Sequence, residues 1–531
     1  MKRNLLFLVA LLSACALQAQ VWKADLGNGK YKNPVLYADY SDPDVCRVGE
    51  DFYMTSSSFN CVPGLQILHS KDLVNWEIAG AALPSVLPGT EGTEAPQYGN
   101  CVWAPSIRYH EGWFYIFYGD PDRGIYMLRT QDVRGLWSEP VLVKNGKGLI
   151  DPCPLWDENG HLYLVHAFAG SRAGLKSVLA VCELSADATR AITESRIVYD
   201  GHKDNPTIEG PKFYKRNGYY YIFAPAGGVR QGWQLALRSK AVYGPYEPKV
   251  VLQQGETPVN GPHQGAWVDT EEGEDWFLHF QDAGVYGRIV HLQPMVWESD
   301  WPVIGKYGEP VKQYHKPKTA AEWAQCAPAE SDEFDSTALG LQWQWAANLN
   351  PKWYYCDARE GLLRLFSYAP TENNQGNVRA SKDMMLNIPN LLLQKTPAPQ
   401  FTVTAKVRFA PHEKNLGERA SMILTGKKSA YWELYKQNDG IVLSLKSELL
   451  NMAVTSVEPK QWIWLRIRFA EKGSCIFSYS LDGRQFKRIE IPVQAVEGQW
   501  IGAKIGLFCT RASQNNNDGG WLDVDWWRIT E

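Results

Sequence analysis

The sequence has little net charge and few long apolar runs. Its 531 residues include 54 Lys and Arg against 58 Asp and Glu, which gives a net charge of −4. No basic stripe is available to attract nucleic acid, and no Lys/Arg cluster lies beside an amphipathic helix to hold a membrane surface. Beyond the N-terminal segment, no stretch reaches the ~18 apolar residues of a membrane span. We therefore expect no nucleic-acid partner and no membrane span.

Several chemical signatures are also missing. No P-loop or Gly-rich strand–helix turn occurs, which argues against a phosphate or nucleotide enzyme, and no G-x-S-x-G elbow marks a serine hydrolase. The ten cysteines form no CxxC pair or other zinc pattern. Cys46, Cys153 and Cys182 stand in apolar, strand-like contexts that are typical of buried thiols. We expect few or no disulfide bridges.

Residues 1–19 are predicted to be a secretory signal peptide. Lys2 and Arg3 form a basic start, an apolar core follows, and small residues precede a cleavage site after Ala19. The stretch Leu12-Ser13-Ala14-Cys15 equally resembles a bacterial lipoprotein signal, in which Cys15 would carry a lipid anchor. We expect an exported, periplasmic protein, with a cell-envelope lipoprotein as the alternative.

An aromatic phrase recurs about every 50–60 residues between positions 30 and 312, a spacing that fits the blades of a propeller. In each copy a turn leads into an aromatic strand: Glu50-Asp51-Phe52-Tyr53, Gly112-Trp113-Phe114-Tyr115, Gly160-His161-Leu162-Tyr163, Gly218-Tyr219-Tyr220-Tyr221 and Glu274-Asp275-Trp276-Phe277. Five copies predict an all-β, five-bladed β-propeller over residues 30–312. Its inner strands would surround one axis, so that each blade offers a residue to a central pocket.

A second domain is predicted after a polar linker at residues 313–329. The segments 401–409 and 463–469 alternate apolar and polar residues, which indicates antiparallel strands with one solvated face. Asp482-Gly483 is typical of a hairpin turn. Residues 330–531 are therefore predicted to form a β-sandwich.

Three acidic residues stand in short turns fixed by Pro or Gly: Asp42 before Pro43, Asp151 before Pro152, and Glu209 in Glu209-Gly210-Pro211. If the repeat closes into a ring, these carboxylates can meet, as glycoside hydrolysis requires of an acid and a base. The 22 Trp and 26 Tyr suit sugar stacking as well as ordinary packing. Asp44 competes with Asp42 for the role of base, whereas we interpret Asp120 and Asp122 as turn residues.

Ordered motifs along nearly the whole mature chain resemble glycoside hydrolase family 43. They are Asn33-Pro34-Val35, Tyr40-Ser41-Asp42-Pro43-Asp44, Leu68-His69-Ser70-Lys71-Asp72-Leu73, Val102-Trp103-Ala104-Pro105, Ile150-Asp151-Pro152, Glu209-Gly210-Pro211, Gly287-Arg288, Asp332-Glu333-Phe334-Asp335 and Gly519-Gly520-Trp521. The resemblance implies a five-bladed propeller followed by a concanavalin-like sandwich. It also implies hydrolysis with inversion at the anomeric carbon.

The resemblance assigns a role to each matching residue. Asp42 would be the general base, Glu209 the general acid, and Asp151 the residue that tunes the pKa of the acid and orients it. Further residues would contact the terminal sugar or lie beside it: Phe59 and Trp103 as aromatic walls, Arg288 as a hydrogen-bond donor, and His263 near the propeller axis. No cofactor is required, although in some relatives the histidine helps to hold a structural calcium ion or a water; a purely structural role for His263 is the alternative.

One segment departs from the xylosidase-like pattern. After Phe59 those members carry an acidic residue and then an aromatic, whereas this chain has Asn60-Cys61-Val62-Pro63-Gly64. This departure favours an exo-acting α-L-arabinofuranosidase on plant hemicellulose, such as xyloglucan or arabinoxylan side chains. The alternatives are an exo-β-1,4-xylosidase on xylo-oligosaccharides, with or without both activities, and a non-catalytic glycan-binding propeller. The sandwich would be a sugar-binding module or a lid, and residues 510–518 would be the lid loop or a solvated turn.

Overall fold

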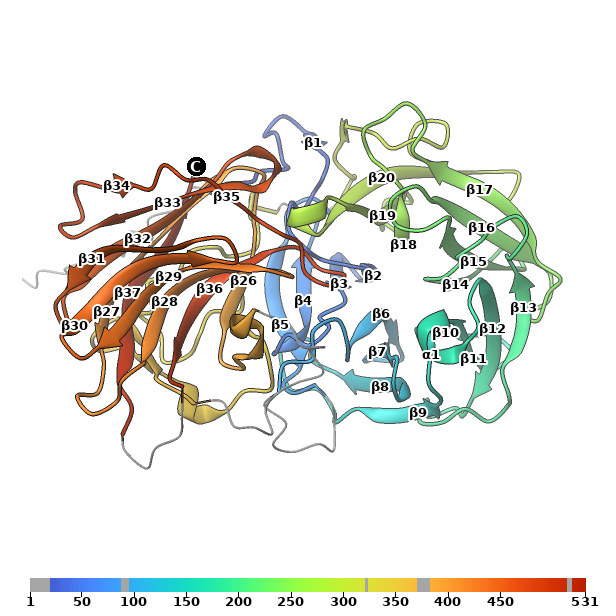
Figure 1. The fold of residues 1–531 in the computed structure, drawn as a ribbon. Coiled ribbons are helices and arrows are strands. Elements are labelled where there is room, and N and C mark those ends of the chain that lie inside the picture. Colours follow the sequence, from blue (N-terminus) through green and yellow to red (C-terminus); the bar gives the residue numbers. More distant parts are fainter. Residues whose placement is uncertain (1–19, 87–94, 320–322, 370–382, 513–517) are drawn as a thin grey trace, which may run out of the picture.

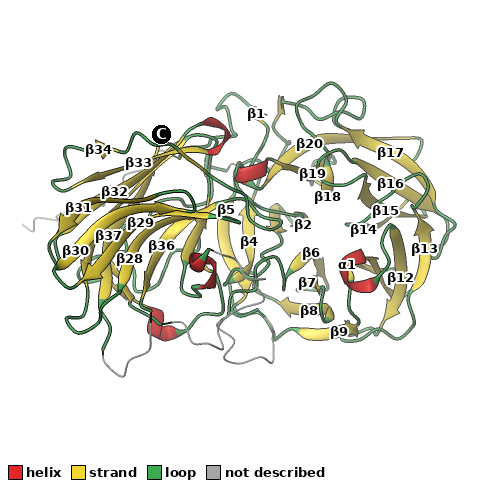
Figure 2. Ribbon diagram, viewed as in Figure 1, coloured by secondary structure: helices red, strands yellow, loops and turns green. Residues whose placement is uncertain are grey.

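The computed structural model describes residues 20–86, 95–319, 323–369, 383–512 and 518–531. The predicted signal peptide, with Cys15 and Ala19, lies outside them. Two all-β domains stand side by side, a propeller and a sandwich (Figure 1). In the part of the chain that the structure describes, helix is confined to short pieces (Figure 2): α1 (Gly170–Ala173), η1 (Gly284–Tyr286), η2 (Pro351–Trp353), η4 (Met384–Asn387) and η5 (Glu471–Gly473). Within the described ranges, none of them is long and apolar enough to cross a bilayer.

The propeller has five blades, each a sheet of four antiparallel strands in chain order. The first blade consists of β2 (Asp44–Val48), β3 (Asp51–Thr55), β4 (Gly64–Ser70) and β5 (Glu77–Leu83). The second consists of β6 (Trp103–His110), β7 (Trp113–Asp120), β8 (Gly124–Thr130) and β9 (Val141–Asn145). The third consists of β10 (Leu149–Trp156), β11 (Leu162–Phe168), β12 (Val178–Leu184) and β13 (Arg196–Asp200). The last two are β14 (Lys212–Arg216), β15 (Tyr219–Ala226), β16 (Trp233–Ser239) and β17 (Glu247–Gln253), then β18 (His263–Asp269), β19 (Asp275–Asp282), β20 (Arg288–Glu298) and β21 (Trp301–Ile304). The predicted propeller is confirmed.

The aromatic phrase found in the sequence marks the second strand of every blade. Adjacent residues of that strand point to opposite faces of the sheet, so both faces must be apolar where the sheet lies between two others. Ile116 packs toward the first blade and Phe117 toward the third; likewise Ile222 and Phe223 pack toward the third and fifth blades. A glycine with positive φ opens each of these hairpins: Gly49, Gly112, Gly160, Gly218 and Gly273.

The N-terminal segment closes the ring. Leu36 pairs with Val290 of β20, through Val290 N–H to the Leu36 carbonyl at 3.0 Å and the reverse bond at 3.3 Å. The Tyr31 hydroxyl donates to the Leu292 carbonyl at 2.8 Å. Strand β1 (Lys30–Lys32) pairs with β22 (Gln313–His315), which lies in the segment predicted to be a linker. The first and last blades are thus joined by residues far apart in the sequence.

The C-terminal domain is a sandwich of two antiparallel sheets. One runs in the order β23 (Gln344–Trp345), β26 (Leu392–Lys395), β36 (Lys504–Thr510), β28 (Arg419–Thr425), β29 (Ser429–Gln437), β30 (Gly440–Ser447) and β31 (Asn451–Val457). The other runs β24 (Tyr354–Asp357), β25 (Leu362–Phe366), β37 (Trp521–Thr530), β27 (Phe401–Ala410), β32 (Trp462–Phe469), β33 (Ser474–Ser480) and β34 (Lys487–Arg488), with β35 (Val493–Gln494) on β33.

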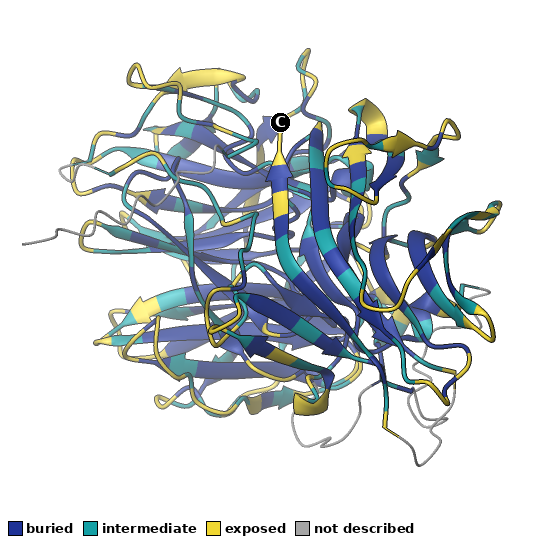
Figure 3. Ribbon diagram, turned by 90° about the vertical axis from the view of Figure 1, so that its left-hand side faces the viewer, coloured by how far each residue is buried: buried dark blue, intermediate teal, exposed yellow. Residues whose placement is uncertain are grey.

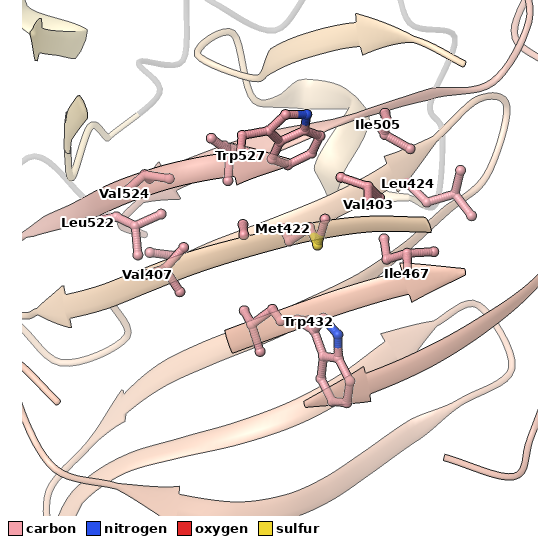
Figure 4. Close-up of a cluster of buried hydrophobic side chains, with 14 of the residues drawn as sticks. Val403, Val407, Met422, Leu424, Trp432, Ile467, Ile505, Leu522, Val524 and Trp527 are labelled. Atoms are coloured by element: carbon pink, nitrogen blue, oxygen red, sulfur yellow. The ribbon is translucent and has the colours of Figure 1, made fainter. Parts of the chain in front are cut away.

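The alternation seen in the sequence places one apolar set between the two sheets (Figure 4). Val403 and Val407 of β27, Ile467 of β32, and Trp432 of β29 are fully or almost fully buried there. Buried residues make up most of the strands in the view of Figure 3, while exposed residues concentrate in the turns. The nine cysteines of the described ranges are free thiols, and all but Cys326 are buried.

The two domains are joined by backbone and side-chain contacts. Val62 of the propeller forms a β-bridge with Trp345 of the sandwich. Lys395 donates from β26 to the side chain of Gln66 in β4, and to Gln344 at 3.1 Å. These contacts fix the sandwich against the first blade.

Candidate active site

The three predicted carboxylates lie together at one end of the inner strands. Asp42 stands two residues before β2, Asp151 lies in β10, and Glu209 stands three residues before β14. They line one cavity of about 120 Å³. The other lining residues come from several blades and from the sandwich: Phe59, Trp103, Ala104, Ile150, Val229, Gln264, Arg288 and Trp500.

The backbone at this site is unusual. Asp42 has φ of 55° and Asp151 has φ of 57°, although both carry a Cβ and both precede a proline. Left-handed conformations of this kind cost about 1–3 kcal/mol each and persist only where the surroundings enforce them. The site therefore holds these two carboxylates in directions that an ordinary strand would not give.

Asp42 is surrounded by hydrogen-bond donors. Its Oδ2 accepts from the hydroxyls of Ser57 at 2.5 Å and Ser41 at 2.9 Å, and its Oδ1 accepts from Arg288 Nη1 at 3.0 Å. The Ser57 Oγ in turn accepts from the backbone N–H of Ala104 at 2.7 Å, which links the first two blades. Asp42 accepts all of these hydrogen bonds, as expected of a carboxylate that serves as a base.

Asp151 and Glu209 form an acidic pair. Burial, and then the negative charge of Glu209, raise the pKa of Asp151 well above its usual value, while the Gly210 N–H bonded to Asp151 Oδ2 at 2.8 Å works in the opposite direction. Asp151 therefore keeps its proton to a higher pH than an exposed aspartate does, because burial and the neighbouring carboxylate both disfavour its ionised form.

His263 contacts this pair from β18. Its Nε2 lies 3.1 Å from Glu209 Oε1, and its ring is buried against Phe280. Its Nδ1 is buried and, among the described residues, has no hydrogen-bond partner. Calcium prefers six to eight oxygen ligands, and no group of three His, Cys, Asp or Glu side chains in the described ranges is arranged for a metal. The side chains around His263 do not by themselves form a calcium site.

Phe59, Trp103 and Arg288 all line the cavity, as their motifs predict. Phe59 exchanges backbone hydrogen bonds with Val102, at 3.0 and 3.2 Å, so its backbone lies beside the residue that precedes Trp103. Arg288 lies over the ring of Phe280, 4.8 Å from its centroid, and reaches Asp42 from the start of β20.

The competing aspartates do other work. Asp44 is fully buried and accepts from the Ile107 N–H at 2.7 Å and from Arg108 Nη1 at 2.6 Å, which joins the first two inner strands. Asp120 accepts from the Asp122 N–H at 2.9 Å in a turn. None of these three carboxylates lines the cavity.

Trp500 is one of the site residues that sequence reasoning missed. It stands in the sandwich domain, more than two hundred positions from the last propeller residue of the cavity, and no local pattern marks it. Its loop is tied to the propeller because Gly502 N–H donates to Asp39 Oδ2 at 3.0 Å and Ala503 N–H to the Val285 carbonyl at 2.8 Å. Gln264 and Val229 also line the cavity and were not predicted as site residues.

The predicted lid loop, residues 510–518, lies largely outside the described residues, because 513–517 are not described. The described sandwich segment that reaches the cavity is instead the Trp500 loop, residues 497–502. On its far side a second cavity of about 270 Å³ shares Val229, Arg288 and Trp500 with the first.

Asn60 does not line the cavity either. Its side-chain amide donates to the Ala346 carbonyl of the sandwich at 2.7 Å, and the residue is almost fully buried. The segment that departs from the xylosidase-like pattern therefore packs at the domain interface. Asn60 therefore gives no direct structural argument for a preference between the two sugars.

Known proteins resemble this chain over nearly its whole length. A protein of Xylanibacter ruminicola named "Putative beta-xylosidase" is 36% identical over 92% of this chain and 87% of its own length. A beta-xylosidase of Formosa agariphila is 31% identical over 94% of this chain and 90% of its own length. The non-reducing end alpha-L-arabinofuranosidase BoGH43B of Bacteroides ovatus is 28% identical over 78% and 77%. The solved structure titled Bacteroides ovatus Xyloglucan PUL GH43B superposes with a TM-score of 0.79, at 25% identity over 94% of this chain and 99% of that one.

Two family models account for the two domains. Residues 331–530 match the beta xylosidase C-terminal concanavalin A-like domain, in agreement with the predicted sandwich. Residues 31–302 match the glycosyl hydrolases family 43 model, the blades that carry the three carboxylates. With this match and the full-length relatives, the chain belongs to glycosyl hydrolases family 43 and is a glycosidase.

Proposed function

We propose that the protein is an exo-acting, inverting glycosidase that releases terminal pentosyl groups from hemicellulose fragments, with β-xylosyl ends as its first substrate. The observation that carries the proposal is the small cavity, about 120 Å³, in which three carboxylates, three aromatic rings and one arginine converge. A cavity of this size suits one sugar ring and excludes the middle of a polysaccharide chain.

The reaction follows from the surroundings of each carboxyl group. Asp42, held among donors, takes a proton from a water as its oxygen forms a bond to the anomeric carbon. Glu209 gives its proton to the leaving oxygen as the glycosidic bond breaks on the opposite face. Asp151 supports this step by positioning the acid, because its Oδ2 accepts from the N–H of Gly210, the residue next to Glu209. Water enters on the face opposite the leaving group, so the anomeric configuration inverts.

Binding and exo-action depend on the walls of the cavity. Phe59 and Trp103 supply apolar faces for the sugar ring, and Arg288 supplies a planar set of donors beside Asp42. Trp500 adds a third aromatic side chain to the lining, from the sandwich domain. The adjoining cavity of about 270 Å³ is the natural position for the leaving group.

The choice between two pentoses rests on separate observations. Two relatives, at 36% and 31% identity over nine tenths of this chain, carry β-xylosidase names. Asn60 contacts the sandwich domain and does not line the cavity. The second candidate is α-L-arabinofuranosidase, favoured by the Bacteroides ovatus relative, which aligns over both domains.

The test is hydrolysis of aryl β-D-xyloside and aryl α-L-arabinofuranoside side by side, with Glu209→Gln as the blank. A higher kcat/KM on the xyloside supports the first candidate, and the reverse order supports the second. NMR of the first-formed sugar reports the anomeric configuration, and retention would refute the assignment of Asp42 as a base. Binding of xylo-oligosaccharides without hydrolysis of any of these substrates would favour the non-catalytic glycan-binding propeller.

We also propose that the protein acts outside the cytoplasm, in the periplasm or the cell envelope, on the composition of residues 2–19. Cell fractionation and mass spectrometry of the mature N-terminus test this. A lipid on Cys15 that is lost in Cys15→Ala would assign a lipoprotein, and an N-terminus at Gln20 would assign ordinary cleavage. An uncleaved chain in the cytoplasm would refute export.

A further inference from the structure

Asp39 joins three parts of the molecule that meet beside the cavity. It is 5% exposed and lies in the N-terminal segment, three residues before Asp42. Its Oδ1 accepts from the backbone N–H of Arg288 at 2.9 Å, and its Oδ2 accepts from the backbone N–H of Gly502 at 3.0 Å. One carboxylate thus holds a peptide of the fifth blade and a peptide of the sandwich domain.

The junction is packed so closely that only glycines fit around the carboxylate. A Cβ on Gly287 would lie 2.4 Å from Cγ of Asp39, and the φ of Gly287 is +77°. A Cβ on Gly502 would lie 2.6 Å from the backbone nitrogen of Gly287. The three segments are therefore in close contact around the carboxylate, with no space for a side chain between them.

Each held peptide leads to a residue of the cavity. The Arg288 whose N–H binds Asp39 uses its own side chain to bind Asp42 Oδ1 at 3.0 Å and Ser41 Oγ at 2.7 Å. The Arg288 carbonyl accepts from the Tyr40 N–H at 3.1 Å, so the segment before Asp42 runs beside it. On the sandwich side, Gly502 stands two residues after Trp500.

We infer that Asp39 is a positioning residue that sets Arg288 and the Trp500 loop in register with each other, and so couples the sandwich domain to the sugar-binding end of the site. The inference rests on the proposed function only for its kinetic consequence; the coupling itself is a property of the fold. Asp39 does not line the cavity, so it acts through these two peptides and not by touching the substrate.

The central variant is Asp39→Asn, which keeps the shape of the side chain. An amide has a single acceptor oxygen, so in either orientation one of the two N–H donors faces an NH₂ group. We expect KM for the aryl pentoside to rise and kcat/KM to fall by roughly tenfold or more, the loss typical of a hydrogen bond to a charged group. Gly502→Ala disturbs the same junction from the sandwich side and is expected to give the same pattern.

A double-mutant cycle separates coupling from general damage. If Asp39 acts partly through the loop, its substitution has a smaller effect in a Trp500→Ala background than in the wild type. Asp72→Asn is the matched control, because Asp72 is also buried and accepts from two backbone N–H groups, of Val74 and Asn75, yet does not line the cavity. We expect Asp72→Asn to leave KM unchanged.

Hydrogen exchange tests the junction independently of activity. In Asp39→Asn, peptides that cover residues 497–503 and 285–290 should exchange several-fold faster than in Asp72→Asn. Unchanged exchange in both peptides, or additive kinetic effects in the cycle from folded variants, would overturn the inference. Failure of the wild type to hydrolyse any pentoside would refute the proposed function instead, and the exchange result would still decide the role of Asp39.

Discussion

Replacing Asp151 by Asn is expected to stabilise the protein at neutral pH while it impairs catalysis. Burial, and then the charge of Glu209, raise the pKa of Asp151 in the folded chain well above the ~3.9 of an unfolded aspartate. Between these two pKa values the folded state binds more protons than the unfolded state, so its stability falls as the pH rises. Each pKa unit of elevation corresponds to about 1.4 kcal/mol of lost stability above the folded-state pKa. Asn carries no charge and therefore avoids this loss.

The assay is thermal unfolding of the wild type and Asp151→Asn across about pH 4 to 8. The difference in Tm should be small near pH 4 and grow with pH, by about 1–2 °C for each kcal/mol in a protein of this size. Asp157→Asn is the control of opposite sign: partial burial acts against it, but hydrogen bonds from Lys215 and Tyr220 lower the pKa of Asp157. That variant should lose stability above about pH 4. A pH-independent difference for Asp151→Asn, or one that favours the wild type, would refute the reasoning.

Three further predictions concern turnover, the Trp500 loop and the domain interface. Glu209→Gln and Asp42→Asn should each lower kcat by roughly 10²–10⁴-fold in folded protein; near-normal rates would contradict their assigned roles. Trp500→Ala should raise KM for small aryl pentosides by about tenfold through lost ring contact, and an unchanged KM would mean that the ring does not touch the sugar. Burial lowers the pKa of Lys395 to about 7, so the unfolded chain binds the extra proton above that pH and stability should rise from about pH 7 to 10. Lys395→Met should flatten this rise in thermal melts, and an identical slope would refute it.

The propeller was predictable because its repeat reflects a packing requirement. A strand with neighbouring blades on both sides needs apolar residues on both faces, as Ile116 and Phe117 illustrate. The same requirement acts in every blade, so it leaves five similar phrases in the sequence. The ring closure between Leu36 and Val290 could not be predicted, because a single pair of backbone hydrogen bonds does not restrict which side chains occur there.

The site was predictable where geometry restricts the sequence locally. Asp42 and Asp151 have left-handed backbones next to prolines, and this local constraint made their motifs visible. Trp500 and Asp39 act through contacts between segments that are distant in the sequence. Such residues could not be predicted, because the local sequence does not indicate a partner across a domain interface. The interpretation of Asn60 as a residue beside the sugar was wrong for a related reason. Its neighbour Phe59 lines the cavity, but the side chain of Asn60 donates to the other domain.

The Trp500 loop also bears on how such an enzyme can diversify. The carboxylates stand on the propeller, whereas Trp500, which lines the same cavity, belongs to the sandwich domain with its own buried core. Substitutions in residues 497–500 can therefore change which leaving groups enter without disturbing the strained turns that aim Asp42 and Asp151. Selection can revise the choice of glycan in one domain while the bond-breaking apparatus is inherited intact in the other.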